Sequence, residues 1–149
     1  MLSFDTNILL HAYNRASPSH RAAFEWLGSI QHLEGVAVSE FVLAEFYGLL
    51  RNQAVIERPL SAGEAVGVVQ AWRSHPRWRL LGFPSGSRDL HESLWRMAAL
   101  PGFAFRRICD VRTALTLVAQ GVTEFATVNV NDFHGLGFAR VWNPIASQG

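Results

Sequence analysis

The chain begins Met1-Leu-Ser-Phe-Asp-Thr-Asn-Ile-Leu-Leu10, and this stretch decides the fold. A short apolar run meets a carboxylate, Asp5, and two small polar residues, after which apolar residues resume. The pattern predicts a strand over Met1 to Phe4 and a short helix over Ile8 to Tyr13. Asp5 is then either the N-cap of that helix or a ligand of a cation site, because sites in open α/β sheets form beyond the carboxyl ends of strands.

The composition describes an ordinary globular chain. It has 149 residues, of which 49% are hydrophobic and 17% charged, and we expect a single domain over residues 1–149. The formal net charge of +1 neither favours nor excludes a polyanionic partner. All thirteen basic residues are Arg, and the absence of Lys excludes P-loop kinases and ATPases, whose phosphate loop needs Gly-Lys-Ser/Thr.

Cys109 is the single cysteine, which excludes an intramolecular disulfide and a site built from several thiolates. We expect it to be buried as a small apolar side chain. The chain shows no charged leader and no apolar run of the roughly 18 to 20 residues that a membrane span needs. These features predict a cytoplasmic protein without membrane contact.

Hydrophobic periodicity divides the rest of the chain into alternating helices and short strands. Helices are expected at residues 17–30, 40–52, 61–74, 88–100 and 108–120. Strands are expected at residues 36–38, 78–83, 125–128 and 138–142, with a loop at 129–137. The alternation predicts an α/β fold with a central parallel sheet and helices on both of its faces.

Three further acidic residues are predicted to reach the sheet edge that Asp5 marks. Glu45 lies within the first two turns of a helix with few polar positions, Asp110 begins an apolar helix, and Asp132 follows the fourth strand. In a parallel α/β sheet, strand ends and helix starts share one edge, so all four can converge. Clustered carboxylates raise one another's pKa and stay ionised around a cation. Oxygen ligands without Cys or clustered His favour Mg²⁺ or Mn²⁺ over zinc.

Each acid also has a plainer interpretation. Glu45 fits the narrow solvent-facing side of its helix, Asp110 fits a helix cap, and Asp132 fits a turn. Glu40 lies five positions before Glu45, about 140° around the helix, so the two cannot face one site. We expect Glu40 to complement the helix dipole from the first turn.

Four segments, in their order and separation, resemble the PIN-domain nucleases and, among these, the VapC-type toxins of bacterial toxin–antitoxin pairs. The segments are Phe4-Asp-Thr-Asn-Ile-Leu9, Ser39-Glu-Phe-Val-Leu-Ala-Glu45, Arg107-Ile-Cys-Asp-Val-Arg-Thr-Ala-Leu115 and Ala126-Thr-Val-Asn-Val-Asn-Asp-Phe133. The closing Phe138-Ala-Arg-Val-Trp-Asn-Pro144 is similar as well. The resemblance therefore spans nearly the whole chain.

The resemblance implies a PIN-like three-layer sandwich with a sheet of about four to five strands. It also implies a Mg²⁺-dependent (or Mn²⁺-dependent) endoribonuclease that acts on RNA as the toxin of a pair, forms a homodimer and is inhibited by a cognate antitoxin. Its acidic quartet carries over as Asp5, Glu45, Asp110 and Asp132. Asp5 and Asp110 would bind the metal directly, and the other two through water.

The fourth position departs from the family pattern. Many relatives have Asp two residues after the Thr of the fourth-strand motif, and here that position is Asn129. Either Asp132 or Asn129 completes the site, or three acids suffice. Thr6 and Thr127 are candidates to hydrogen-bond a ligand carboxylate.

Arginines flank Asp110 and are candidates to bind RNA phosphates. These are Arg106, Arg107 and Arg112, whose alternative role is pairing with surface acids. The Trp and Phe residues are expected in the core more often than stacked on bases.

Three other interpretations remain open. A PIN-type nuclease of RNA maturation or quality control would use the same site. A degenerate PIN fold would be a binding module without activity. A phosphoryl-transfer enzyme with Asp5 as nucleophile is disfavoured, because such sites usually depend on a Lys and this chain has none.

Overall fold

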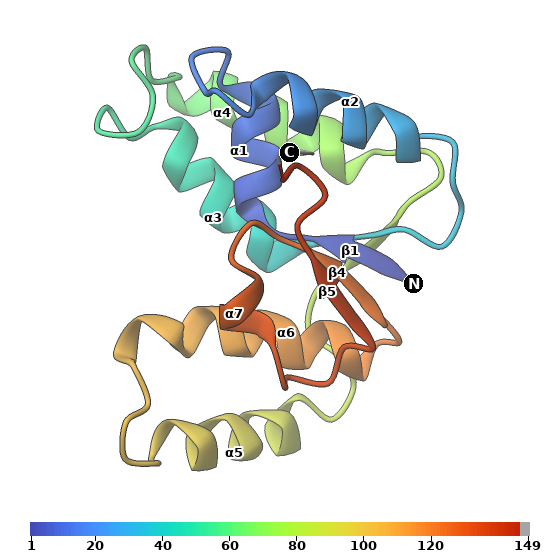
Figure 1. The fold of residues 1–149 in the computed structure, drawn as a ribbon, viewed down its shortest axis with the longest axis vertical. Helices are drawn as coiled ribbons and strands as arrows, with labels where there is room; N and C mark the ends of the chain where they lie inside the picture. Colours follow the sequence, from blue (N-terminus) through green and yellow to red (C-terminus); the bar gives the residue numbers. More distant parts are fainter. Residues whose placement is uncertain (147–149) are drawn as a thin grey trace.

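The computed structural model describes residues 1–146 and shows helices packed on both faces of parallel strands (Figure 1). In chain order the elements are β1 (Leu2–Phe4), α1 (Thr6–Tyr13), α2 (His20–Ile30), β2 (Ala37–Ser39), α3 (Glu40–Leu50), α4 (Ala62–Arg73), β3 (Arg79–Leu81), α5 (Ser87–Ala98), the 3-10 helix η1 (Phe105–Arg107), α6 (Ile108–Ala119), β4 (Glu124–Ala126), α7 (Val130–Phe133) and β5 (Arg140–Trp142). The predicted α/β class and the parallel strand direction are confirmed.

The continuous sheet is smaller than the four to five strands we predicted. Strands β1, β4 and β5 form one sheet in the order β1-β4-β5, and β2 and β3 form a separate parallel pair. A single bridge between Leu2 and Val36 joins the two sheets. Beyond it, the Ser3 hydroxyl donates to the Ala37 carbonyl at 2.7 Å, so a side-chain hydrogen bond takes the place of the backbone ladder.

Two apolar cores lie on opposite sides of the strands, and alternate strand residues supply them. Helices α1 to α4 lie on one side and α5 to α7 on the other (Figure 1). Val36 and Val38 face the first core, whereas Ala37 between them faces the second. Phe4 of β1 belongs to the first core and Phe125 of β4 to the second.

Helix starts agree with the sequence where a capping side chain is present. The Ser39 hydroxyl accepts hydrogen bonds from the backbone N–H groups of Phe41 and Val42 at the start of α3. Ser61 and Glu64 form a capping box at the start of α4, as predicted. These caps fix where α3 and α4 leave the preceding segments.

Most predicted elements are present with ends shifted by one to three residues, and the structure differs more clearly at two places. The helix expected from Ser17 begins at His20, because the Ser17 hydroxyl accepts from the Ser19 N–H at 3.1 Å and contacts His11 at 2.7 Å. These contacts make a turn before the helix. The loop expected at residues 129–137 contains the one-turn helix α7, which is too short to show periodicity.

Cys109 is exposed, which contradicts the expected burial. It is the second residue of α6, and the buried face of this helix is formed instead by Val111, Ala114 and Leu117. Within residues 1–146, no helix is long and apolar enough to cross a membrane.

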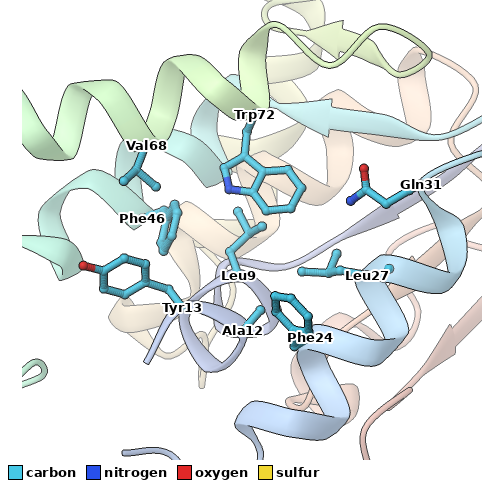
Figure 2. A pocket seen from close by; sticks show the side chains of 10 residues that line it. Leu9, Ala12, Tyr13, Phe24, Leu27, Gln31, Phe46, Val68 and Trp72 are labelled. Carbon is cyan, nitrogen blue, oxygen red and sulfur yellow. The ribbon is translucent and has the colours of Figure 1, made fainter. Parts of the chain in front are cut away.

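An apolar pocket of about 380 Å³ lies among α1, α2, α3 and α4 (Figure 2). Phe24 stands at this pocket with 64% of its surface exposed. The lining residues are Leu9, Ala12, Tyr13, Phe24, Leu27, Gly28, Gln31, Phe46, Val68 and Trp72. No acidic or basic side chain lines this pocket, so it is not the place for phosphodiester chemistry.

Candidate active site

Asp5 lies directly beyond β1 and is almost completely buried, with 6% of its surface exposed. Its backbone N–H donates to the Ala126 carbonyl at 2.9 Å, which continues the pairing with β4. Its Oδ1 accepts from the Thr6 N–H at 2.8 Å, so Asp5 is indeed the N-cap of α1. A cap can be exposed, however, and burial of a carboxylate requires further partners.

Those partners come mainly from the residues after β4. The Thr127 hydroxyl, itself buried, donates to Asp5 Oδ2 at 2.7 Å. The Asn7 side-chain amide donates to the same Asp5 oxygen at 3.2 Å and to the Thr127 hydroxyl at 3.3 Å. The Asn129 N–H donates to the Thr127 hydroxyl at 3.0 Å. This network orients the Asp5 carboxylate and links the ends of β1 and β4.

The charges of the four predicted acids repel one another in pairs. Burial raises the pKa of Asp5 to about 6, against the lowering effect of the Thr127 hydrogen bond, and the charges of Glu45 and Asp132 raise it further. Burial also raises the pKa of Asp110 to about 6, with additional repulsion from Asp5 and Asp132. Each carboxylate therefore lies within the electric field of others.

Glu45 joins this group although its helix position is solvent-exposed. The surrounding protein raises the pKa of its carboxyl group, and the charge of Asp110 raises it further. A hydrogen bond with the Thr6 side chain lowers the same pKa. Thr6 therefore donates its backbone N–H to Asp5, while its hydroxyl, which donates to the Val42 carbonyl at 3.4 Å, lies near Glu45.

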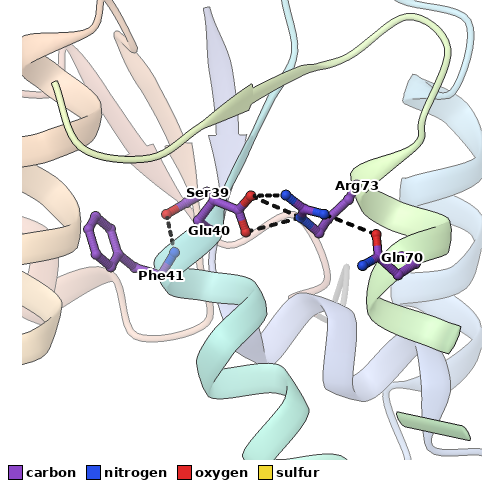
Figure 3. Close-up of polar contacts among 5 residues, drawn as sticks. All are labelled: Ser39, Glu40, Phe41, Gln70 and Arg73. Atoms are coloured by element: carbon purple, nitrogen blue, oxygen red, sulfur yellow. Dashed lines mark hydrogen bonds and ion pairs between the residues drawn. The ribbon is translucent and has the colours of Figure 1, made fainter. Parts of the chain in front are cut away.

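Glu40 does not belong to the group. It lies in the first turn of α3, and its carboxylate forms an ion pair with Arg73 of α4 at 2.8 Å (Figure 3). Arg73 Nε donates to Glu40 Oε1 at 2.9 Å, and Arg73 Nη1 donates to Gln70 at 3.0 Å. The separation of Glu40 from the other acids is therefore as expected, although its pairing with Arg73 was not foreseen.

Asp132 is positioned by α7 and by Arg107. Arg107 Nη2 donates to the Asp132 backbone carbonyl at 3.1 Å, and the Arg107 charge lowers the pKa of Asp110. A polar cavity of about 330 Å³ opens beside residues 128–132, which form its lining. Asn129 is the exposed N-cap residue of α7 and lines the same cavity.

The three candidate arginines differ in their surroundings. Arg106 is exposed, and its guanidinium carbon lies 5.9 Å from the centre of the Phe105 ring. Arg107 instead donates a hydrogen bond to the Asp132 carbonyl of α7. Arg112 lies over the Phe41 ring at 4.6 Å. Among residues 1–146, none of these arginines forms an ion pair, so pairing with surface acids does not explain them.

The acids fit a hard divalent cation by their chemistry. All four donors are carboxylates, and their mutual repulsion is relieved by a positive charge placed between them. Within residues 1–146, no three His, Cys, Asp or Glu side chains already stand in ligand geometry. The Asp5 carboxylate is already held by the hydrogen bonds of Thr6, Asn7 and Thr127.

Asn7 is the site residue that sequence reasoning missed. It bridges Asp5 and Thr127, and its carbonyl oxygen accepts from the Val128 N–H at 3.4 Å. The available signal was its place two residues after Asp5, from which a short polar side chain can reach back to the preceding carboxylate.

Comparison with known proteins identifies the family of the chain. A family model for the PIN domain matches residues 3–126, which contain Asp5, Glu45 and Asp110. The chain belongs to the PIN-domain family. Asp132 lies in the last part of the chain, beyond the matched residues.

PIN-domain relatives extend over the full chain. Ribonuclease VapC24 of Mycobacterium tuberculosis is 49% identical over 149 residues, which cover all of both chains. The crystal structure of M. tuberculosis VapC20, a toxin that cleaves the sarcin–ricin loop, has a TM-score of 0.62 at 18% identity, with 84% of this chain and 87% of VapC20 covered. FitAcB from Neisseria gonorrhoeae has a TM-score of 0.64 at 21% identity, with 97% and 98% covered. Because these sequence identities are low, the likeness of the two structures to this chain shows a shared fold and no more.

Proposed function

We propose that this PIN-domain protein is a metal-dependent endoribonuclease that hydrolyses RNA phosphodiester bonds as the toxin of a toxin–antitoxin pair. The observation that carries the proposal is the buried Asp5 carboxylate beyond β1, held by Thr6 and Thr127. The charges of Glu45, Asp110 and Asp132 act in the same region and support it. The full-length similarity to a protein named Ribonuclease VapC24 supports the same activity.

In this proposal Asp5 and Asp110 would be the direct ligands of Mg²⁺ or Mn²⁺, and Glu45 and Asp132 would hold it through water. The bound metal would lower the pKa of a water molecule and neutralise charge on the phosphoryl oxygens. Thr127 and Asn7 hold the Asp5 carboxylate in a fixed orientation. Glu45, whose pKa is raised, is suited to accept a proton from the attacking water.

Asp132 is the better candidate for the fourth position. Its charge raises the pKa of both Asp5 and Asp110, so its carboxylate acts on the centre of the site. Asn129 contributes its backbone N–H to Thr127 and lines the adjacent cavity. We therefore assign Asp132 to the acid site and Asn129 to its support.

The partners follow from the same proposal. RNA is the substrate, a cognate antitoxin restrains the activity in the cell, and the toxin forms a homodimer. The charge pattern does not favour a purely structural binding module, because a module without chemistry has no need of four mutually repelling carboxylates.

Cleavage of RNA by the purified protein tests this function. We expect cleavage with Mg²⁺ or Mn²⁺, none with EDTA, and restoration when the metal is added back in excess. Asp5→Asn should lose the activity, because it removes a ligand charge while keeping the side-chain shape. Equal cleavage by wild-type and Asp5→Asn proteins, prepared identically, would show that the site or the activity is wrongly assigned.

A further inference from the structure

An aromatic cluster with a cation lies beside the acid site. Phe83 follows β3, and 65% of its surface is exposed. The rings of Phe83 and Phe41 pack edge to face, with their centroids 4.9 Å apart. The Arg112 guanidinium lies over Phe41 at 4.6 Å. His91 of α5 lies 6.1 Å from Phe83. These contacts hold Phe83 at the surface with much of its ring open to solvent.

Arg112 has unused hydrogen-bonding capacity. Its Nε is buried and has no partner within residues 1–146, and no ion pair engages its guanidinium there. A buried N–H group without a partner is costly and rare in folded proteins. A phosphate cannot reach the buried Nε itself, but within residues 1–146 no acid pairs with the Arg112 guanidinium, so its terminal Nη donors can bind a phosphate.

The cluster lies along the same edge as the acids. Phe83 follows the carboxyl end of β3, and Phe41 follows that of β2, which pairs with β3. Asp5 follows the carboxyl end of β1, which the Leu2–Val36 bridge joins to the start of β2. Neighbouring strands are about 4.8 Å apart, so the end of β3 is about 10 Å from that of β1. Phe41 also lies one helical turn before Glu45 on the same face of α3.

We propose that Phe83, Phe41 and Arg112 form a subsite for an unpaired nucleotide adjoining the RNA bond that is cut. The base stacks on the open face of Phe83, and Arg112 holds a backbone phosphate. Proteins commonly bind single-stranded RNA by combining stacking on aromatic side chains with a cationic contact. This inference rests on the proposed ribonuclease function and adds that the substrate is unpaired at this position.

RNA binding measured in EDTA separates this subsite from metal-dependent cleavage. The probe is a short fluorescein-labelled RNA without self-complementarity, and the readout is fluorescence anisotropy. Phe83→Ala should weaken binding about 5- to 100-fold, because one base loses its stacking partner. Phe83→Trp should restore most of the affinity, since it supplies another flat aromatic face. The same RNA annealed to its complement should bind more weakly and be insensitive to Phe83→Ala.

Phe24→Ala is the matched control. Phe24 is 64% exposed and also lies near a histidine, His20 at 5.9 Å, but it belongs to α2 on the opposite side of the strands. Its removal should leave RNA affinity unchanged. Arg112→Gln should reduce the dependence of log affinity on log salt concentration by roughly 0.7, the loss of one phosphate contact on a single strand.

Unchanged affinity in Phe83→Ala would overturn the subsite, and if Asp5→Asn still abolished cleavage, the ribonuclease function would stand without it. A change in oligomeric state on size-exclusion chromatography, together with lost binding, would also overturn the subsite and assign the cluster to a protein interface. Failure of the wild type both to bind and to cleave RNA would reject the two proposals together.

Discussion

Asp5 is both the N-cap of a helix, a position that can be exposed, and a buried carboxylate. It caps α1 through the Thr6 N–H, and it is buried among other carboxylates whose charges oppose its ionisation. Its titration therefore links protein stability to the function of the site. In the unfolded chain Asp5 titrates near pH 3.8, whereas in the folded protein its pKa is about 6.

The folded state consequently binds more protons than the unfolded state between these two pH values. The contribution of Asp5 to stability is fully present below about pH 4 and is lost as the pH rises through 6. Above that pH, ionised Asp5 costs the folded, metal-free protein about 3 kcal/mol. In EDTA, Asp5→Asn should match the wild type near pH 4 and exceed its free energy of unfolding by about 2 to 3 kcal/mol near pH 7.5.

Urea unfolding at a series of pH values measures this difference directly. Subtracting the wild-type curve from the Asp5→Asn curve cancels the groups that Asp5 does not influence and leaves Asp5 together with the acids coupled to it. A difference that does not change with pH would contradict the raised pKa of Asp5.

Thr127 offers a second test at the scale of one hydroxyl group. Thr127→Val keeps the side-chain shape but removes the 2.7 Å hydrogen bond to Asp5 and the acceptor for the Asn129 N–H. A hydrogen bond to a charged group contributes about 1.5 to 3 kcal/mol, so we expect RNA cleavage to fall at least tenfold and stability to fall by about 2 kcal/mol. Thr127→Ser keeps the hydroxyl and should retain most activity. Equal activity in the Val and Ser variants would exclude this role.

At the scale of elements, α3 carries two glutamates with opposite surroundings. Glu45 is coupled to Asp110, whereas Glu40 is paired with Arg73 of α4 (Figure 3). Glu45→Gln should lower the cleavage rate by at least tenfold, because it removes the proton acceptor and a metal-site charge. Glu40→Gln should leave the rate unchanged and cost at most about 1 kcal/mol of stability, since its ion pair is partly exposed. Equal rates for the two variants would contradict the division of α3 into a catalytic and a structural glutamate.

The contact between η1 and α7 gives a further prediction. Arg107→Met keeps much of the apolar stem but removes the hydrogen bond to the Asp132 carbonyl and the charge beside Asp110. With Asp132 less firmly placed, we expect the Mn²⁺ concentration needed for half-maximal cleavage to rise several-fold. Arg106→Met, at the exposed neighbouring position, is the control and should not change the metal requirement. A metal requirement unchanged in Arg107→Met would show that α7 is positioned without it.

Sequence reasoning succeeded where a local rule fixed an element. Caps at Ser39 and Ser61 and the apolar spacing of α6 predicted helix starts. The shared edge of a parallel sheet also predicts one common site for the acids, which stays a prediction that metal binding tests. Sequence reasoning did not find α7, whose four residues are shorter than the period of any helix signal. It did name Thr127 as a hydrogen-bond partner of a ligand carboxylate, as the bond to Asp5 shows, but it did not find the contacts of Asn7 with Thr127 or of Phe83 with Phe41. Those depend on strand register and on packing between distant segments, which no local pattern contains.

At the scale of the whole molecule, the strands separate two cores and leave one polar edge. The first core contains Phe4 and Phe46 and supports α1, which Asp5 caps, and α3, which carries Glu45. The second core contains Phe125 and Leu117 and supports α6 and α7, which carry Asp110 and Asp132. The acid site therefore draws its residues from both halves of the fold. A cation bound there would link the two helical layers, because its ligands come from each.

Mn²⁺ binding by isothermal titration calorimetry tests the central claim most directly, since it needs neither the RNA target nor the antitoxin. At pH 7.5 the wild type should bind Mn²⁺, whereas Asp5→Asn and Asp110→Asn should each bind at least tenfold more weakly, and Glu40→Gln should bind like the wild type. Equal Mn²⁺ affinity in the wild type and both Asp→Asn variants, or no binding by the wild type, would contradict a metal site formed by these acids.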